Sequence, residues 1–522
     1  MKLLLFFRYN VSCLANFQQT EKRATMNHDT KQSALPPLTA DFLRSSSCLI
    51  DNLFADLWKQ MGMNALLTRI GFQKRSGTPV NEVMFSIMLW VFLKANSVSM
   101  FARESLCTFS GSGKDALYNA LNREDWNWRS LNLEMARKAV MRMGKSTAAK
   151  AFVLDDSINI RHGKKMPGVS SHFDHTSGKH VMGQQVLTLG LSCGEGFVPL
   201  DSELFISATK AQPLNQPFLD GRSTAAKRYS IALKQTKPQM AKAMMSRALR
   251  AGIEATYLLA DSWFGTKPMI RIAEDALLTP ILRMKKNLMK YRLSEVKDGQ
   301  VLHKDMNVAE LFQSQVRCKW DRISGLPYES KVLDVGLNLD DSTDKTTCWR
   351  KVRLLFVRGI VEGDKVQAGK HDWAVFLTTD MGMKPQRILE LYAMRWAIEV
   401  YFKEAKQYLG FLKEQGTHYA SYIASIHLTA IRFCMLSIGR SIHNASGILD
   451  MRKQLSANIT NIDFVARLWP CFRALISGAL DDLKVLLGDT VFLVMEAIEL
   501  RVKSFFVQAL QLDPRILLLE FS

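Results

Sequence analysis

Two short apolar runs near the middle of the chain each end at an aspartate. Phe152-Val153-Leu154 precedes Asp155 and Asp156, and the run from Ala255 to Ala260 precedes Asp261. Such runs are typical of buried strands with polar ends. Strands that alternate with helices predict an α/β fold, with a mixed sheet covered by helices on both faces. Sites in open α/β sheets form at the carboxyl ends of strands, where these aspartates lie.

The remaining pattern divides the chain into regions. Further strands at 186–191, 197–200 and 280–284 and helices at 238–251 and 268–276 place an α/β core at 149–286 and 380–415. Strands at 331–337, 351–357 and 373–378 predict a β-rich insertion at 287–379. We expect a disordered polar lead at 1–38, a helical and DNA-binding N-terminal domain at 39–148, and a helical C-terminal region at 416–522. A plain helical packing domain explains 39–148 equally well from these residues alone. The 522 residues fit two to four domains at roughly 100–200 residues each.

The charge of the chain points to a polyanionic partner. There are 69 Lys and Arg against 49 Asp and Glu, which gives a formal net charge of +20. Such a surplus favours nucleic acid, although a basic soluble protein of another kind has the same composition. The eight cysteines include no Cys-x-x-Cys pair, which fits a reducing cytoplasm. The longest apolar stretch, 83–93, is shorter than the ~20 residues needed to span a bilayer, so we expect no membrane association.

A polar stripe on one predicted helix is the sharpest feature. The helix is expected at 384–410, and at ~100° per residue the side chains of Tyr392, Arg395, Glu399 and Lys406 share one face within about 60°. Glu404 falls on the opposite side. A solvated face with ion pairs four residues apart explains the stripe equally well from the helix alone.

These residue types suit phosphodiester chemistry. Mg²⁺ prefers carboxylate oxygens as ligands, and three carboxylates from distant parts of a chain can hold two ions. Two ions activate the attacking oxygen and stabilise the leaving oxygen. Arg, Lys and Tyr beside them can bind the phosphates that flank the bond to be cut.

The order of these features resembles the insertion-sequence-four family of DDE transposases. The resemblance covers about 152–412 and rests on strand-Asp156-Ser157, strand-Asp261, the β-rich insertion and the Tyr392-x2-Arg395-x3-Glu399-x6-Lys406 signature. It implies an RNase H-like catalytic domain interrupted by the insertion, with two Mg²⁺ ions, replaceable by Mn²⁺, on Asp156, Asp261 and Glu399. Successive strand residues point to opposite faces, so Asp155 and Asp156 compete for the first position. The family pattern of Asp followed by Ser or Thr favours Asp156.

The resemblance also implies residues that contact DNA. Tyr392 and Arg395 correspond to phosphate contacts near the transposon end, and Lys406 to a DNA contact. Arg283, at the end of the strand at 280–284, corresponds to a phosphate-binding arginine. Trp373 resembles an insertion-domain tryptophan that stacks on a flipped base, although packing inside the insertion is the favoured role for it from the sequence alone.

Together these features predict a transposase of a bacterial insertion sequence. It would bind the terminal inverted repeats of its element and perform metal-dependent cut-and-paste transposition. Its partners would be double-stranded DNA, as transposon ends and as target, and a second copy of the chain in a homodimeric synaptic complex. We expect a cytoplasmic, nucleoid-associated protein. The alternatives are a catalytically inactive remnant or transposition inhibitor that still binds DNA, another RNase H-like nuclease, and a basic structural or RNA-binding protein.

Overall fold

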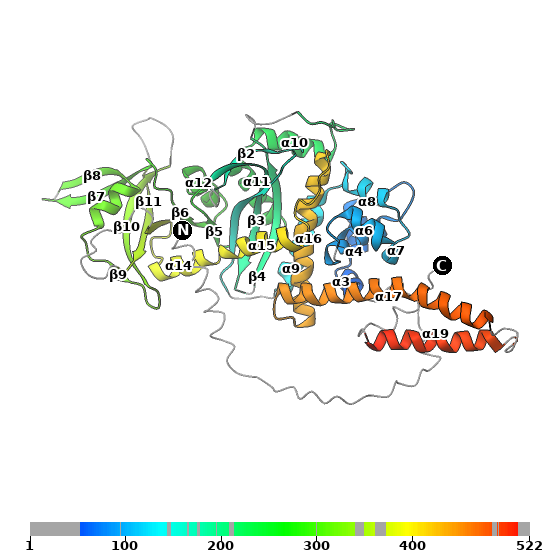
Figure 1. Cartoon of the computed structure of the whole chain (residues 1–522). Helices are drawn as coiled ribbons and strands as arrows, with labels where there is room; N and C mark the ends of the chain where they lie inside the picture. The colour runs from blue at the N-terminus through cyan, green and yellow to red at the C-terminus, as the bar shows by residue number, and fades with distance from the viewer. Residues whose placement is uncertain are drawn as a thin grey trace. The chain divides into compact units, whose positions relative to one another are not determined.

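The chain folds into two compact units, which are taken separately below (Figure 1). The computed structural model describes residues 53–509 except 94, 144–147, 164–165, 175–177, 195, 208–212, 299, 340–348, 361–371, 483–487 and 489. The sheet unit comprises 143–213 and 228–404, and the helical unit comprises 53–142, 214–227 and 405–509. The lead expected to be disordered, 1–38, lies outside the described residues.

One 12-stranded sheet forms the sheet unit. Its strand order is β2-β3-β1-β5-β6-β12-β11-β10-β7-β8, with β4 paired to β3 and β9 paired to β10. The strands are β1 Ala151–Ile160, β2 Ser170–Asp174, β3 Lys179–Cys193, β4 Gly196–Phe205, β5 Tyr257–Ala260, β6 Thr279–Arg283, β7 Lys290–Lys297, β8 Gln300–Asn307, β9 Asp321–Arg322, β10 Tyr328–Asn338, β11 Trp349–Gly359 and β12 Trp373–Thr378. Among the strands that the structure describes, only the pairs β1–β5 and β5–β6 are parallel. The α/β fold predicted from the sequence is confirmed, and it is consistent with an RNase H-like arrangement.

Helices pack on both sides of this sheet. They are α10 Thr224–Lys234, α11 Lys237–Arg250, α12 Lys267–Asp275, α13 Val308–Gln315, α14 Pro385–Ala393 and α15 Trp396–Tyr408. A capping box between Thr236 and Gln239 starts α11, whose buried face is rich in Met and Ala and contacts β3 and β4. Contacts with β6 hold α12 and α14. These helices place polar side chains from outside the sheet next to the ends of β1 and β5.

The single helix predicted at 384–410 is wrong, because the structure breaks it at Met394 and Arg395. The amides of Met394, Arg395 and Ile398 each donate to the carbonyl three residues earlier, which is a tighter turn than an α-helix makes. The hydroxyl of Ser192 on β3 donates to the Met394 carbonyl at 3.0 Å. No Gly or Pro marks this break, so tertiary contacts override a sequence that is helical throughout.

The β-rich insertion continues the same sheet. Strand β12 pairs with β6 on one side and with β11 on the other. Within the insertion the ring of Trp373 stacks on Phe312 of α13, with centroids 4.0 Å apart and planes at 2°. Phe356 of β11 lies against the same indole at 5.9 Å. Trp373 therefore belongs to the core of the insertion, and only 6% of its surface is exposed.

The helical unit joins segments from both halves of the sequence. It contains α3 Leu53–Gln60, α4 Met63–Ile70, α5 Val80–Leu89, the 3₁₀ helix η1 Trp90–Phe92, α6 Val98–Glu104, α7 Leu106–Phe109, α8 Lys114–Leu121, α9 Trp128–Arg142, α16 Tyr419–His443, α17 Ile448–Asp482 and α19 Thr490–Ala509. Helix α16 packs against α9, α8 and α17. This helix is long and apolar enough to cross a membrane. However, 94% of its most apolar 18-residue stretch is buried inside the protein, as in the core helix of a folded domain.

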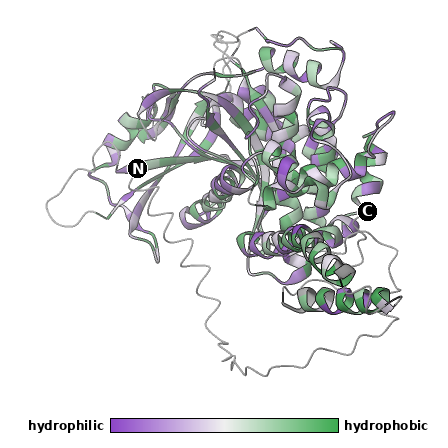
Figure 2. Cartoon of the chain, turned by 45° about the vertical axis from the view of Figure 1, so that its right-hand side comes forward, coloured by the Kyte–Doolittle hydropathy of each residue, from purple (hydrophilic) through white to green (hydrophobic). Residues whose placement is uncertain are grey.

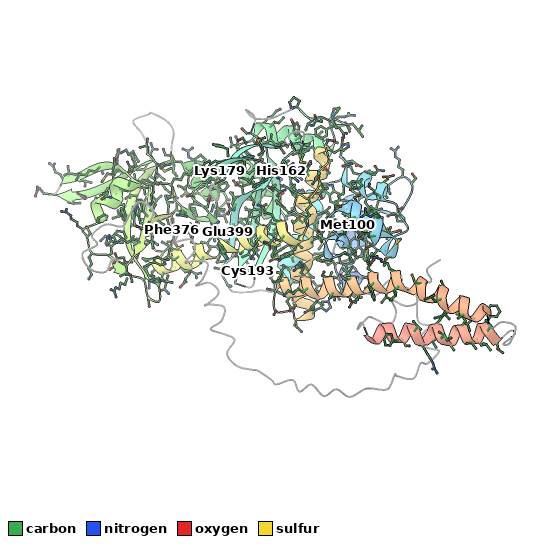
Figure 3. The ribbon with its side chains drawn as sticks, viewed as in Figure 1. Met100, His162, Lys179, Cys193, Phe376 and Glu399 are labelled. Atoms are coloured by element: carbon green, nitrogen blue, oxygen red, sulfur yellow. The ribbon has the colours of Figure 1, made fainter. Side chains whose placement is uncertain are left out.

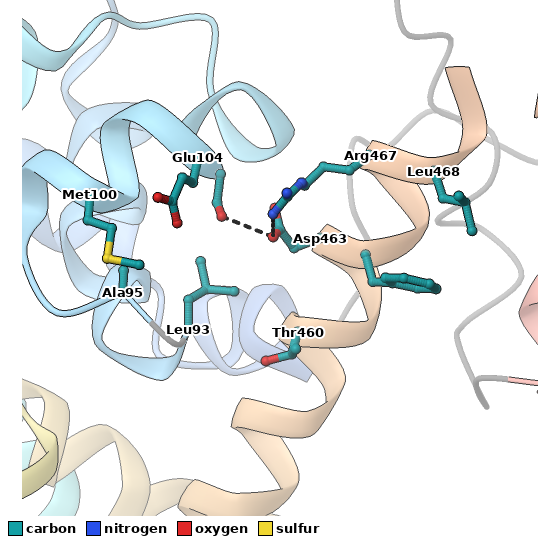
Figure 4. A pocket seen from close by; sticks show the side chains of 10 residues that line it. Leu93, Ala95, Met100, Glu104, Thr460, Asp463, Arg467 and Leu468 are labelled. Carbon is teal, nitrogen blue, oxygen red and sulfur yellow. Dashed lines mark hydrogen bonds and ion pairs between the residues drawn. The ribbon is translucent and has the colours of Figure 1, made fainter. Parts of the chain in front are cut away.

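Buried polar groups connect the helices of this unit. The guanidinium of Arg432 on α16 is 2% exposed and donates to the carbonyls of Ile87, Met88 and Leu409. Asp463 on α17 accepts hydrogen bonds from the Ser105 and Thr108 hydroxyls at 2.9 and 3.0 Å. This carboxylate and Arg467 line a cavity of about 440 Å³ between α6 and α17 (Figure 4).

The C-terminal helices expose apolar side chains. Phe492, Leu493 and Phe505 of α19 are each more than half exposed, and green residues run along this helix in Figure 2. Leu475 of α17 is 71% exposed. Exposed apolar side chains gathered on one pair of helices are typical of a surface that packs against another chain.

Candidate active site

Strand register aligns three candidate residues across the sheet. Leu154 of β1 pairs with Ala260 of β5, and Ala260 pairs with Leu282 of β6. The next position on each strand is therefore Asp155, Asp261 and Arg283 in one row. Residues that occupy the same row of a sheet point to the same face. The sheet thus brings two carboxylates and a guanidinium together at the carboxyl ends of parallel strands.

Asp156, the first ligand expected from the sequence, points to the opposite face. Its carboxylate accepts a hydrogen bond from the Lys237 ammonium of α11 at 2.7 Å and another from the Gln185 amide at 2.7 Å. Lys237 is buried, with 4% of its side chain exposed. Asp156 therefore lies in a closed ion pair beneath α11, on the face of the sheet away from Asp261.

The break between α14 and α15 places the Arg395 side chain next to Asp155 in the row. One guanidinium nitrogen donates to Asp155 at 2.9 Å, and another donates to Glu399 one turn along α15. Glu399 is labelled on α15 in Figure 3. Only 6% of the Arg395 side chain is exposed, against 17% for Asp155 and 27% for Glu399. One buried cation therefore bridges the strand carboxylate and the helix carboxylate, and this fixes Glu399 close to Asp155.

The electrostatics of Asp155 reflect a crowded acidic site. The pKa of its carboxyl is raised from 3.8 to about 8: burial is the largest cause, the charges of Asp261 and Asp156 add to it, and Arg395 acts in the opposite direction. Burial lowers the pKa of Arg395, but Tyr392, Asp155 and Glu399 outweigh that effect and leave the pKa above its ordinary value. The guanidinium is therefore permanently charged, and it offsets only part of the effect of burial and acidic neighbours on the pKa of Asp155.

Tyr392 completes the group from the end of α14. Its ring packs edge-on against Phe376 of β12 at 4.6 Å, and the Arg395 guanidinium lies 5.7 Å from the ring centroid. Burial raises the pKa of the phenol to about 12, while Arg395 and Arg283 lower it. The hydroxyl therefore stays protonated at neutral pH and can donate a hydrogen bond.

Two expected DNA contacts lie apart from this group. Lys406 is half-buried in the last turn of α15, two turns beyond Glu399. Trp373 is covered by Phe312, and the Lys286 ammonium lies 3.7 Å from its ring centroid. In this structure Trp373 packs against Phe312 and Lys286, and its expected contact with a base stays a prediction.

Sequence reasoning missed the residues that surround Asp261. The amide of Trp263 donates to the Asp261 carboxylate at 2.9 Å, and the Lys237 ammonium lies 4.2 Å from the Trp263 ring centroid. The available sequence signal was the Trp263-Phe264-Gly265 segment, which follows Asp261 after a single serine. Lys237 could not have been found, because its role depends on the packing of α11.

The donor set suits a hard divalent cation, with one obstacle. Asp155, Asp261 and Glu399 offer carboxylate oxygens, the ligands that Mg²⁺ prefers. Within the described ranges, no three His, Cys, Asp or Glu side chains lie close enough together to hold a metal as they stand. Arg395 stands between two of the carboxylates. A metal ion shared by Asp155 and Glu399 would compete with Arg395 for their oxygens.

Comparison with known proteins agrees with this chemistry. A family described as DDE superfamily endonuclease matches residues 93–301, and a family described as transposase DDE domain matches residues 219–431. Between them the matches include Asp155, Asp261 and Glu399. No curated protein gave a significant match. The two domains support a DDE transposase, a class of enzyme that acts on DNA and generally uses divalent metal ions.

Proposed function

We propose that this protein is the transposase of a bacterial insertion sequence, in the insertion-sequence-four family, and that it cuts and rejoins DNA at the terminal inverted repeats of its element. The observation that carries the proposal is the row of Asp155, Asp261 and Arg283, closed by Arg395 and Glu399. Such a set combines acidic ligands with cations that bind phosphate. The reaction would take place in the cytoplasm, on the DNA of the nucleoid.

We assign the acids as Asp155, Asp261 and Glu399, with Asp155 in place of Asp156. Two Mg²⁺ ions, replaceable by Mn²⁺, would be held by these three carboxylates and would supply an activated attacking oxygen and a stabilised leaving oxygen. The support for Asp155 is its register with Asp261 and its ion pair with Arg395. Asp156 is committed to Lys237 on the other face.

The basic residues have a separate task. When DNA enters, Arg395 exchanges a carboxylate for a phosphate oxygen, since a guanidinium binds both groups with the same fork geometry. Arg283 lies in the same row and neutralises a neighbouring phosphate. Tyr392 remains protonated and donates to a phosphate oxygen. Lys406, farther along α15, binds the backbone of the duplex, and the net charge of +20 attracts DNA to the whole surface.

Cutting both ends of an element calls for two active sites. We propose a homodimer in the synaptic complex, supported by the exposed apolar side chains of α17 and α19. Apolar residues at helical spacing in 483–494 also suggest a dimer contact, and part of this segment lies outside the described residues.

The test is cleavage of a labelled duplex that carries the terminal repeats of the element, with Mg²⁺. Wild type is compared with Asp155→Asn, Asp156→Asn and Glu399→Gln, and DNA binding is measured for each by gel shift. We expect cleavage to be lost in Asp155→Asn and Glu399→Gln while binding survives, and Asp156→Asn to keep measurable cleavage.

Each other result has a distinct meaning. Loss of cleavage in Asp156→Asn alone would restore the first ligand favoured by the sequence pattern. Binding without cleavage by the wild type would instead support a catalytically inactive remnant or a transposition inhibitor.

A further inference from the structure

A buried lysine joins the two strand ends that carry the candidate acids. Lys237 lies in the first turn of α11 and is 4% exposed. Its ammonium donates to the Asp156 carboxylate at 2.7 Å. It also lies 4.9 Å from the ring centroid of Phe205, the last residue of β4, and 4.2 Å from that of Trp263. One cation therefore connects β1, β4 and the loop after β5.

Each of two groups that Lys237 contacts leads to a candidate acid through one backbone amide. The Asp156 amide donates to the Asp155 carboxylate at 2.8 Å. The Trp263 amide donates to the Asp261 carboxylate at 2.9 Å. Hydrogen bonds of this kind set the orientation of carboxylates that hold metal ions. The position of the Lys237 ammonium therefore affects the orientation of both acids.

The loop after β5 is fixed from two sides. On one side, a Cβ added at Gly265 would collide with the Arg283 carbonyl oxygen, and only glycine permits this approach to the end of β6. On the other side lies the contact between the Lys237 ammonium and the indole of Trp263. Trp263 is 40% exposed, so packing alone leaves its ring partly free. The cation is therefore the contact that holds this side of the loop.

Helix α11 has its own anchors apart from the charge of Lys237. Its buried face is rich in Met and Ala and contacts β3 and β4, and the capping box of Thr236 and Gln239 closes its first turn. A buried ammonium needs an anion or aromatic rings around it. At Lys237 these come from side chains next to the acids, and Gln185 is a second donor to the Asp156 carboxylate. The charge thus orders the site more than it holds the helix.

We propose that Lys237 is a positioning residue for the cleavage reaction, and that it holds the Asp155 and Asp261 carboxylates in the arrangement needed to share metal ions. The proposal rests on the proposed function, and it gives the ion pair of Asp156 and Lys237 a role in that site. Lys237 acts through the amides of Asp156 and Trp263, without contact with the DNA. Loss of a residue that orients metal ligands costs roughly 10–100-fold in metal affinity or activity.

Amide exchange tests this geometry without depending on catalysis. Hydrogen–deuterium exchange is measured by mass spectrometry, with fragmentation to single amides, on the full-length wild type, Lys237→Met and Lys237→Arg. Methionine keeps the length of the side chain and removes its charge. We expect Lys237→Met to lose protection at the Asp156 and Trp263 amides while α11 keeps its own protection. Lys237→Arg, which keeps a cation, should retain both. Unchanged protection of both amides in Lys237→Met would overturn the proposal.

Cleavage kinetics test the consequence for the reaction. The terminal-repeat duplex is cut at increasing Mg²⁺ concentrations, and DNA affinity is measured separately in Ca²⁺. Lys237→Met should raise the Mg²⁺ concentration for half-maximal cleavage roughly tenfold, because the ligands are no longer held in orientation. Its affinity for DNA should equal that of wild type. Lys237→Arg should stay close to wild type in both measurements.

Two other cations of the sheet unit provide matched controls. Lys242→Met makes the same change on α11, at an exposed ion pair with Asp275. Arg228→Met removes an equally buried cation of α10, which is bound to Glu203 on β4. Both variants should keep the Mg²⁺ requirement of wild type, although Arg228→Met should have a lower melting temperature. A Mg²⁺ requirement raised equally in Arg228→Met and Lys237→Met would reduce Lys237 to a stabilising ion pair and overturn the proposal.

The outcomes separate this proposal from the proposed function. A wild type that cuts the duplex, with the same Mg²⁺ requirement and the same amide protection in Lys237→Met, would sink the positioning role and keep the transposase. A wild type that does not cut the duplex would overturn the proposed function. In that case, protection lost in Lys237→Met would still support the lysine as the residue that orders both carboxylates.

Discussion

Removing the carboxylate of Asp155 should change how stability depends on pH. The folded protein holds this proton more tightly than the unfolded chain does, because the pKa rises from 3.8 to about 8 on folding. The stabilisation is therefore complete below pH 4 and is lost as the pH rises towards 8. Asp155→Asn keeps the shape of the side chain but cannot ionise, so its stability should not fall over this range.

The size of the effect follows from the shift. One pKa unit corresponds to about 1.4 kcal/mol, so a change from 3.8 to about 8 sets a ceiling of about 5 kcal/mol. The carboxylate is 17% exposed, and water and Arg395 reduce that figure. Between pH 5 and pH 9, we expect the free energy of unfolding of Asp155→Asn to gain about 3 kcal/mol relative to wild type.

The assay is urea unfolding followed by circular dichroism at pH 5, 7 and 9 without divalent ions. The control is Asp305→Asn in the β7–β8 hairpin, where a hydrogen bond from Arg292 lowers the pKa of the aspartate. Asp305 stays ionised across the whole range, so the free energy of unfolding of Asp305→Asn should differ from that of wild type by the same amount at each pH. If the difference between Asp155→Asn and wild type is also independent of pH, the reasoning is refuted and Asp155 is ionised throughout.

Three further changes test the packing around the site and in the helical unit. Gly265→Ala should cost about 1–3 kcal/mol and slow cleavage, because its Cβ collides with the Arg283 carbonyl; unchanged urea unfolding and cleavage would contradict the close approach. Trp373→Ala should lower the free energy of unfolding by about 3–5 kcal/mol, since it empties a buried stack on Phe312, and a variant as stable as wild type would mean that the ring is dispensable. Arg432→Met should cost about 2–4 kcal/mol in thermal unfolding, because it leaves buried carbonyls without donors; an unchanged melting temperature would show that the carbonyls find other donors.

The α/β fold could be predicted because strand and helix periodicities are local. The choice between Asp155 and Asp156 could not, because it depends on the register of β1 against β5. Because side chains alternate along a strand, Asp155 and Asp156 must face opposite sides of the sheet. Which of them lies on the side of Asp261 depends on the register of β1 against β5. The family pattern favoured Asp156, and the register favours Asp155.

Long-range packing accounts for the other differences. The helix break at Arg395 is not marked by Gly or Pro in the sequence. It accompanies an ion pair with Asp155, which is far away along the chain. The union of α9 with α16 in one unit joins segments separated by the whole sheet unit. Trp263 was overlooked because exposure beside a strand end is a property of the folded loop, and no periodic pattern reports it.

The pairing of β6 with β12 has a consequence for how chains of this kind can diverge. Arg283 and Phe376 are direct partners, so the two ends of the segment between them lie on neighbouring strands about 4.8 Å apart. The entropic cost of closing such a loop grows only with the logarithm of its length. An excursion as long as a small domain can therefore grow, shrink or be exchanged while the row of Asp155, Asp261 and Arg283 stays in place. The number of residues between Asp261 and Glu399 can therefore vary widely. The register of β1, β5 and β6, which aligns Asp155, Asp261 and Arg283, has to be kept.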